Sequence, residues 1–369
     1  MKNPPKSIAL IARELDAAPE APLRRLLLVD CDNERSAAGV NPLAAGLGGE
    51  NWSITTPLVP PFSPVFGTDR FESAWSGLSF LRSLVRVIPR HEAVLVQAGT
   101  ETALVRLALP VIVLSRFFGK KVVLQLTSAD IELLLDRRER FVAPLLRQAS
   151  AVIVGSRYLQ KSLARSRVSA AALTAPVDLH GIQHRVVEQP QPRILMTSPL
   201  RFENNPLCAL RAFRLVKQKY PRAELVIAGD GPMRATLERT VAAQRLYGVE
   251  FATALQPEEI RRLHSECDVY LNSSSVEETP PGLVRAFAAG LPVVVTDADG
   301  LLPMVRERVN ALIAPVNDHA GLANRIIELI EDPELTTKLS RAGAGEAQKY
   351  TWSRVRQDWV NVLGGSIAR

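Results

Sequence analysis

Short apolar runs alternate with amphipathic stretches along most of the chain. In the first half, buried strands are predicted at Leu26–Val29, Ala93–Gln97, Lys121–Leu126 and Ala151–Val154. Segments with helical spacing of apolar positions lie between these runs, including Thr102–Phe118 and Val142–Gln148. Strands that alternate with helices in this way predict a parallel sheet whose two faces are both covered by helices.

A second alternating series follows the proline-containing segment Gln189–Pro192, which we interpret as a linker. The predicted strands of this series are Ile194–Thr197, Glu224–Ala228, Val249–Ala252, Asp268–Asn272, Pro292–Thr296 and Ala311–Ile313. The predicted helices are Leu207–Lys219, Met233–Gln244, Pro257–Glu266, Pro281–Ala289 and Ala320–Glu331. The pattern therefore predicts an α/β protein with two doubly wound, Rossmann-like domains that face an interdomain cleft.

The same pattern predicts the domain boundaries. Residues 1–22 form an N-terminal extension, residues 23–188 the first domain and residues 189–350 the second. Within the extension, apolar residues at helical spacing predict a short amphipathic helix over Ser7–Ala17. This helix either docks on the body of the protein or lies on a membrane surface, and the pattern leaves both interpretations open.

The charge is unevenly distributed along the chain. Residues 1–190 hold 23 Lys/Arg and 17 Asp/Glu, a net charge of +6, out of +7 for all 369 residues. A basic first half indicates an anionic partner such as a phosphorylated ligand or a membrane surface. Nucleic acid is not expected, because the basic residues are scattered and few aromatic residues accompany them.

Cysteine use and hydropathy bear on the cellular compartment. The three cysteines, Cys31, Cys208 and Cys267, are widely spaced, which suits a reducing environment better than a disulfide framework. The longest strongly apolar run, Leu107–Leu114, is too short to span a bilayer, and Ile8–Ala12 is too short for a signal peptide. The expected location is cytoplasmic, with peripheral contact at the inner face of an anionic membrane as an open alternative.

Two glycine-containing segments of the second domain follow predicted strands and precede predicted helices. Gly229-Asp-Gly231 either makes a tight turn or brings the backbone close to a phosphate. Glu277-Glu-Thr-Pro-Pro-Gly-Leu-Val-Arg285 opens the helix Pro281–Ala289, whose free N–H groups suit a diphosphate. Glu277 and Glu278 either accept hydrogen bonds from sugar hydroxyls or act as capping carboxylates at the helix dipole.

The sequence shows no other catalytic signature. Neither a nucleophile elbow nor a Walker loop is present. The five histidines show no metal-ligand spacing with cysteines or acids: His91, His180, His184, His264 and His319. We interpret them as structural or solvated side chains and expect no bound metal.

Four segments of the second domain, in the right order, carry a family resemblance. They are Ala209–Val216, Pro221–Pro232, Cys267–Ser273 and Ala286–Asp297 with Gly300. In these segments the chain resembles glycosyltransferase family 4, the retaining nucleotide-sugar glycosyltransferases of the GT-B fold, as a divergent member. The resemblance covers residues 193–360.

Outside these segments the resemblance is weaker. In the first domain it rests on Gly39 after the first strand and on Ser156 with Pro176-Val-Asp178. Tyr350-Thr-Trp352 is similar to the aromatic start of the family's last helix. The resemblance therefore implies that residues 351–369 form a C-terminal helix that packs back on the first domain.

The resemblance implies transfer of a sugar from a UDP- or GDP-sugar to a glycan or lipid-linked acceptor, in polysaccharide or glycoconjugate biosynthesis. The nucleotide sugar is a co-substrate, and no further cofactor is expected, because fixed cationic and dipolar groups can replace a metal at the diphosphate. At matching positions it implies Glu277 and Asp130 as catalytic residues. The implied donor-binding residues are Gly39, Arg201, Asn204, Gly231, Glu278, Thr279, Gly282, Leu283 and Arg285.

The chain departs from the family pattern at several of these positions. The second glutamate of the family's E-x7-E motif falls on Arg285, which cannot accept a hydrogen bond. The family's diphosphate-clamping Arg and Lys fall on Pro199 and Asn204, so Arg201 or Arg285 is left to replace them. The sequence alone leaves open whether Arg201 or Arg285 binds the diphosphate.

The first domain departs as well. The family's His-Ser-Gly-Glu-like turn is replaced by Thr127-Ser-Ala-Asp130, so Asp130 either takes the place of the acid or is a first-turn acid of a helix. These departures leave open a catalytically impaired GT-B relative that acts as a partner subunit or ligand sensor. The two-domain architecture also leaves open a sugar-nucleotide epimerase or another hydrolytic enzyme.

Overall fold

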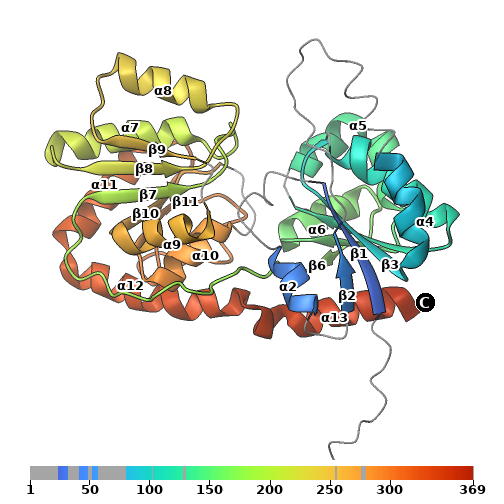
Figure 1. The fold of residues 1–369 in the computed structure, drawn as a ribbon. Coiled ribbons are helices and arrows are strands. Elements are labelled where there is room, and N and C mark those ends of the chain that lie inside the picture. The colour runs from blue at the N-terminus through green and yellow to red at the C-terminus, as the bar shows by residue number, and fades with distance from the viewer. Residues whose placement is uncertain are drawn as a thin grey trace, which may run out of the picture.

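The computed structural model describes residues 24–31, 41–48, 52–56, 80–101, 103–127, 130–253, 256–275 and 280–368. These residues form two lobes, each built on a six-stranded parallel sheet (Figure 1). The predicted α/β class with two doubly wound domains is confirmed. The helix predicted over Ser7–Ala17 lies outside the described residues.

The first sheet has the strand order β2-β1-β3-β4-β5-β6, and its pairings are parallel. Its strands are β1 (Arg24–Asp30), β2 (Trp52–Thr55), β3 (Ala93–Ala98), β4 (Lys121–Leu126), β5 (Ala151–Val154) and β6 (Ala171–Ala172). All six residues of β3 are buried, because the central strands are covered on both faces. This is why apolar runs without alternation predict these strands correctly.

The helical elements that cover this sheet lie on both of its faces. They are α2 (Pro42–Gly48), residues 80–87 with the 3-10 turn η2 (Ile88–Arg90), the π-helical η3 (Ala103–Ala108), α4 (Leu109–Phe117), α5 (Asp130–Leu146) and α6 (Arg157–Arg165). α5 begins well before the predicted helix Val142–Gln148. The reason is that Ile131, Leu134 and Leu135 supply an apolar face for the core, although α5 bends at Arg138.

The second sheet has the order β12-β11-β10-β7-β8-β9. Its strands are β7 (Arg193–Thr197), β8 (Glu224–Ala228), β9 (Val249–Ala252), β10 (Val269–Asn272), β11 (Val293–Thr296) and β12 (Leu312–Ala314). The helices are α7 (Pro206–Lys219), α8 (Arg234–Ala243), α9 (Pro257–Glu266), α10 (Pro281–Ala289), α11 (His319–Glu331) and α12 (Pro333–Ala347). The strand order turns back at β7, so a ligand of this sheet is expected at the carboxyl ends of β7 and β10.

The chain crosses between the lobes at two neighbouring points. Leu173 packs in the core of the first domain, whereas Val177 and Val187 are buried in the core of the second. The packing therefore places the first crossing between Leu173 and Val177, earlier than the predicted boundary at residues 188–189. At the second crossing the carbonyl of Tyr350 accepts a hydrogen bond from the Val177 N–H at 2.9 Å.

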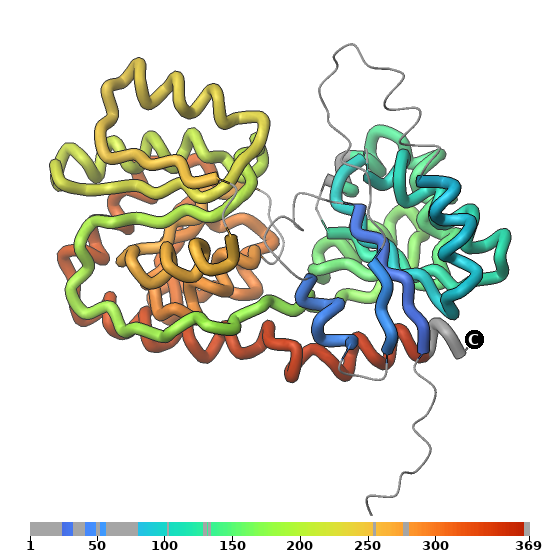
Figure 2. Tube along the Cα trace, viewed as in Figure 1, coloured from blue at the N-terminus to red at the C-terminus, as the bar shows by residue number. Residues whose placement is uncertain are grey.

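After η4 (Gln348–Tyr350) the chain returns beneath the first lobe as α13 (Trp352–Ala368) (Figure 2). Trp359 of α13 is fully buried, and its indole N–H donates to the carbonyl of Thr174 at 2.8 Å. Val355 and Leu363 join it in one core cluster with side chains of β1, β3, β4 and β5. α13 thus completes the cover of the sheet face that α2 occupies in part.

Candidate functional site

Three loops meet at the carboxyl ends of β7 and β10. They follow β7, β8 and β10, and the last of them opens α10. Ser198, the first residue after β7, has a buried hydroxyl with no hydrogen-bond partner among the described residues. A buried hydroxyl without a partner costs free energy, so its presence at this edge favours a polar ligand or water there. Sequence reasoning missed Ser198, because a serine after a strand is an ordinary loop residue.

The two glycines of Gly229-Asp-Gly231 lie directly against the loop that follows β7. A methyl group on Gly229 would overlap the carbonyl oxygen of Ser198, and one on Gly231 would lie 2.6 Å from that of Leu200. Leu200 N–H also donates to the Asp230 carbonyl at 2.8 Å. The close packing of both glycines against the loop after β7 therefore explains the tight turn, which is one of the two interpretations of this segment. A donor-binding role for Gly231 stays a prediction.

Hydrogen bonds tie the loop after β10 to the loop after β7. The Ser273 hydroxyl donates to the carbonyls of Asn204 (3.1 Å) and Asn205 (2.9 Å), and the Ser275 hydroxyl donates to that of Glu203 (2.9 Å). The Asn204 side chain is buried, and its amide donates to the Ser274 hydroxyl at 3.4 Å. Asn204 therefore helps to hold the two loops together. The donor-binding role predicted for Asn204 is a separate one.

The first turn of α10 rests on a polar platform formed by Thr197 and Tyr270. The hydroxyls of these two residues lie 3.1 Å apart, and Tyr270 also donates to the Thr197 carbonyl at 3.2 Å. A methyl group on Gly282 would overlap the Thr197 hydroxyl and lie 2.6 Å from that of Tyr270. Gly282 therefore lets the helix N-terminus, with its free N–H groups, approach the edge of the sheet.

We expect Gly282→Ala to weaken nucleotide binding at least about tenfold and to cost about 1–3 kcal/mol of unfolding free energy, because the added methyl overpacks the platform. Calorimetric titration and urea unfolding measure the two effects. Gly345→Ala on α12 is the matched control, since nothing lies within 4 Å of its added carbon. Unchanged affinity in Gly282→Ala would show that the position of this turn does not govern binding.

His264 of α9 supports the same turn from the other side. Its Nδ1 lies 2.7 Å from the Ile260 carbonyl oxygen and its Nε2 lies 3.3 Å from that of Gly282, while its ring stacks on Tyr270. The ring is almost completely buried. These contacts agree with the structural role expected for His264. The spacing of residues in the sequence does not reveal its contact with Gly282.

The stability of the protein is expected to fall as the pH drops from 6.5 to 4. Burial lowers the pKa of His264 from 6.5 to about 4. In that interval the unfolded chain binds a proton that the folded protein excludes, so the unfolding free energy decreases by about 3 kcal/mol. Urea unfolding at pH 7 and pH 4.5 tests this in the natural chain and in His264→Gln. An equal loss in both proteins would contradict the assignment.

The two candidate clamp arginines lie in different surroundings. Burial lowers the pKa of Arg285, while the charges of Asp178 and Tyr270 act in the opposite direction. Arg261 of α9 lowers the same pKa further, so a second cation also lies near the Arg285 guanidinium. Arg201 is half-buried in the loop after β7, where its backbone N–H donates to the Pro199 carbonyl at 2.9 Å. The side chain of Leu283 is fully buried, so a ligand can meet only its backbone.

Several predicted site residues lie outside the described part of the chain. These are Gly39, Glu277, Glu278 and Thr279. Asp130 is the first residue of α5, directly beyond the carboxyl end of β4, and only its backbone is described. This position agrees with a first-turn acid and also with an acid at the sheet edge, so its catalytic role stays a prediction.

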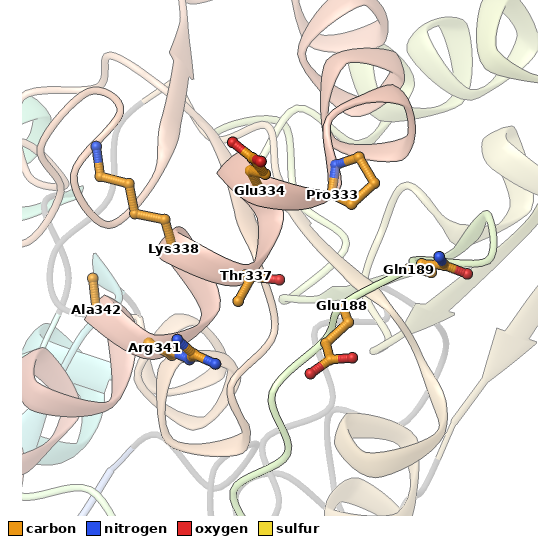
Figure 3. Close-up of a pocket in the computed structure, with 8 residues that line it drawn as sticks. All are labelled: Glu188, Gln189, Pro333, Glu334, Thr337, Lys338, Arg341 and Ala342. Atoms are coloured by element: carbon orange, nitrogen blue, oxygen red, sulfur yellow. The ribbon is translucent and has the colours of Figure 1, made fainter.

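An open groove of about 800 Å³ lies away from this edge, between residues 188–189 and α12 (Figure 3). Its lining includes two acids, Glu188 and Glu334, and two bases, Lys338 and Arg341. The opposite charges balance, and the groove has no contact with the platform beneath α10. We assign no ligand to it.

Residues 182–345 match the family model described as Glycosyl transferases group 1. The chain is 27% identical over 173 residues to the putative glycosyltransferase EpsD of Bacillus subtilis, covering 46% of this chain and 44% of EpsD. It is 31% identical over 144 residues to the amylovoran biosynthesis glycosyltransferase AmsK of Erwinia amylovora, covering 37% and 35%. The chain thus spans less than half the length of these two curated relatives.

Two solved structures are similar over almost the whole chain. Anabaena HepE in complex with UDP-glucose has a TM-score of 0.67 at 18% identity, covering 92% of this chain and 99% of HepE. Sucrose-phosphate synthase from Thermosynechococcus elongatus has a TM-score of 0.73 at 16% identity, covering 94% and 100%. The chain therefore has the GT-B fold, and its second domain contains a region similar to the group 1 glycosyltransferases.

Proposed function

We propose that the protein is a retaining glycosyltransferase that moves a sugar from a UDP- or GDP-sugar to a glycan or lipid-linked acceptor. The observation that carries the proposal is the N-terminus of α10, held at the switch point of the second sheet. Gly282 brings this turn close to Thr197 and Tyr270. The Ser198 hydroxyl, which has no hydrogen-bond partner among the described residues, follows Thr197 at the end of β7.

The chemistry follows from where negative charge develops. When the bond between the sugar's anomeric carbon and the diphosphate breaks, the leaving nucleoside diphosphate gains negative charge. The free N–H groups and the positive dipole end of α10 stabilise that charge, and Arg201 or Arg285 adds a cation. The new bond forms to an acceptor oxygen, whose proton passes to the leaving diphosphate. Because these groups are fixed in the protein, we propose that transfer needs no metal ion.

The similar proteins support the substrate classes. HepE was solved with UDP-glucose, and the names of AmsK and the putative colanic acid glycosyltransferase WcaL of Salmonella typhimurium indicate polysaccharide biosynthesis. The basic first domain suits an anionic or lipid-linked acceptor.

A cytoplasmic location is part of the proposal. It rests on cysteine chemistry, since all three cysteines are buried and no disulfide joins any two of them. Buried thiols that do not form disulfides are typical of a reducing compartment. Among the described residues, no helix combines the length and the hydropathy that crossing a bilayer requires.

Binding of a panel of nucleotides and nucleotide sugars, measured by calorimetry without added metal, tests the proposal. We expect saturable binding of one nucleoside diphosphate, unchanged by a chelator, and that result would name the base for an acceptor search. Loss of binding in the chelator would refute metal independence. Failure of the whole panel to bind would refute the donor site and would favour a partner subunit or ligand sensor.

A further inference from the structure

The outer side of the first lobe carries apolar side chains that the core does not use. α4 lies on the side of this lobe turned away from the second lobe (Figure 1). Val105 of η3 is 39% exposed, and Val113 and Phe117 of α4 are 56% and 81% exposed. Their spacing of eight and four residues places them in one stripe along the helix. The opposite side of the same helix, with Val111 and Ile112, is fully buried.

The neighbouring helix repeats the arrangement. In residues 80–87, Leu81 and Val85 are exposed and four residues apart, while Leu84 is buried in the core cluster that also contains Val111. η2, at the end of this helix, contacts α4. The two helices thus pack on the same core cluster, and each of them exposes apolar side chains on its outer side. We call these two helices, with η2 and η3, the outer helical face.

The charges on the outer helical face have one sign. Arg82, Arg86, Arg90, Arg106 and Arg116 are all exposed. No acidic residue occurs among residues 80–90 or 103–121, and Lys120 and Lys121 follow α4. An apolar strip bordered by cations, on helices that lie parallel to the surface, is the pattern of a protein face that settles into the headgroup region of an anionic bilayer.

We propose that the outer helical face docks the protein on anionic membrane surfaces. Charge selects this occupant: an apolar protein partner would not require the run of arginines, and a nucleic acid would not require the exposed valines and Phe117. The arginines bind lipid phosphates, while Phe117 and Val113 enter the acyl boundary. The inference concerns a surface separate from the site beneath α10 and does not depend on the proposed function.

Cosedimentation with vesicles tests the inference. We expect the full chain to bind vesicles of phosphatidylcholine with about one third phosphatidylglycerol, but not vesicles of phosphatidylcholine alone. Arg82→Glu with Arg86→Glu should weaken binding at least about 25-fold, since each cation near the surface contributes about fivefold. The matched control reverses two exposed arginines of the second domain, Arg211→Glu with Arg214→Glu, and should retain most of the binding.

The apolar contribution needs its own variant. Phe117→Ser should weaken binding about tenfold, and the loss should persist at high salt because apolar burial is not screened. Tyr247→Ser, which changes an equally exposed aromatic residue of the second domain, should have little effect. Circular dichroism and thermal unfolding check that each variant is folded. Absence of binding to anionic vesicles, or equal binding by the natural chain and both outer-face variants, would overturn the inference.

Discussion

Glu277→Ala is expected to abolish glycosyl transfer, by at least about 1,000-fold, while nucleotide binding stays within about threefold of the natural chain. The family resemblance implies that this carboxylate lies near the transferred sugar, whereas the proposed nucleotide site is the turn of α10 with Arg201 or Arg285. Loss of a group that acts on the sugar lowers the rate of transfer more than it lowers affinity for the nucleotide.

The structure describes the residues on either side of the segment that carries Glu277. On one side, Ser275 is anchored to Glu203 by both its N–H (2.8 Å) and its hydroxyl (2.9 Å). On the other side, Pro280 is the N-cap of α10. In the sequence Glu277 lies two residues after Ser275 and three before Pro280, and it is itself outside the described residues.

Single-turnover assays and calorimetry of the same preparations separate the two effects. Glu250→Ala is the matched control, because this glutamate is an exposed residue of β9 in the same domain. Retained turnover in Glu277→Ala would refute the catalytic assignment. Loss of nucleotide affinity together with turnover would instead make Glu277 part of the nucleotide site.

Most of the sheet architecture follows from the sequence, because buried parallel strands are continuous apolar runs. β3, β4, β5, β7 and β8 each have such a run, and the structure places a strand at each. α12 was not predicted. Its small residues, Ala342, Gly343 and Gly345, hide the amphipathic pattern, although a close approach requires one of them: a methyl on Gly343 would lie 2.7 Å from the ring of Phe287.

The sequence indicates where the candidate site lies in the fold, but it does not indicate how the residues of the site pack against one another. The order of motifs locates the edge of the second sheet, and Gly282 can be singled out as a glycine in the first turn of a helix. A glycine is required there because the hydroxyls of Thr197 and Tyr270 lie beneath it. These two residues are more than 70 positions apart in the sequence. A single sequence contains no signal for such a contact. The same holds for His264, because its position in the sequence does not indicate that its ring lies against the Gly282 carbonyl.

Trp359→Ala is expected to lower the free energy of unfolding by about 3–5 kcal/mol. Trp359 is fully buried and packs in one cluster with Leu26, Leu28 and Leu95 of the first sheet, although it is separated from them by most of the chain. Removal of the indole leaves a large cavity and an unpaired carbonyl at Thr174, which now accepts its N–H at 2.8 Å. Both effects are larger than a surface change can produce.

Urea unfolding followed by far-UV circular dichroism measures this loss, and Trp359→Phe divides it into parts. The phenyl ring fills much of the cavity but offers no N–H, so this variant should lose only about 1–2 kcal/mol. Removal of residues 352–369 should expose the same face of the first sheet and destabilise that domain at least as much as Trp359→Ala. A loss below about 1 kcal/mol in Trp359→Ala would mean that α13 contributes little to the core, and that the first domain is stable without the helix returning from the second.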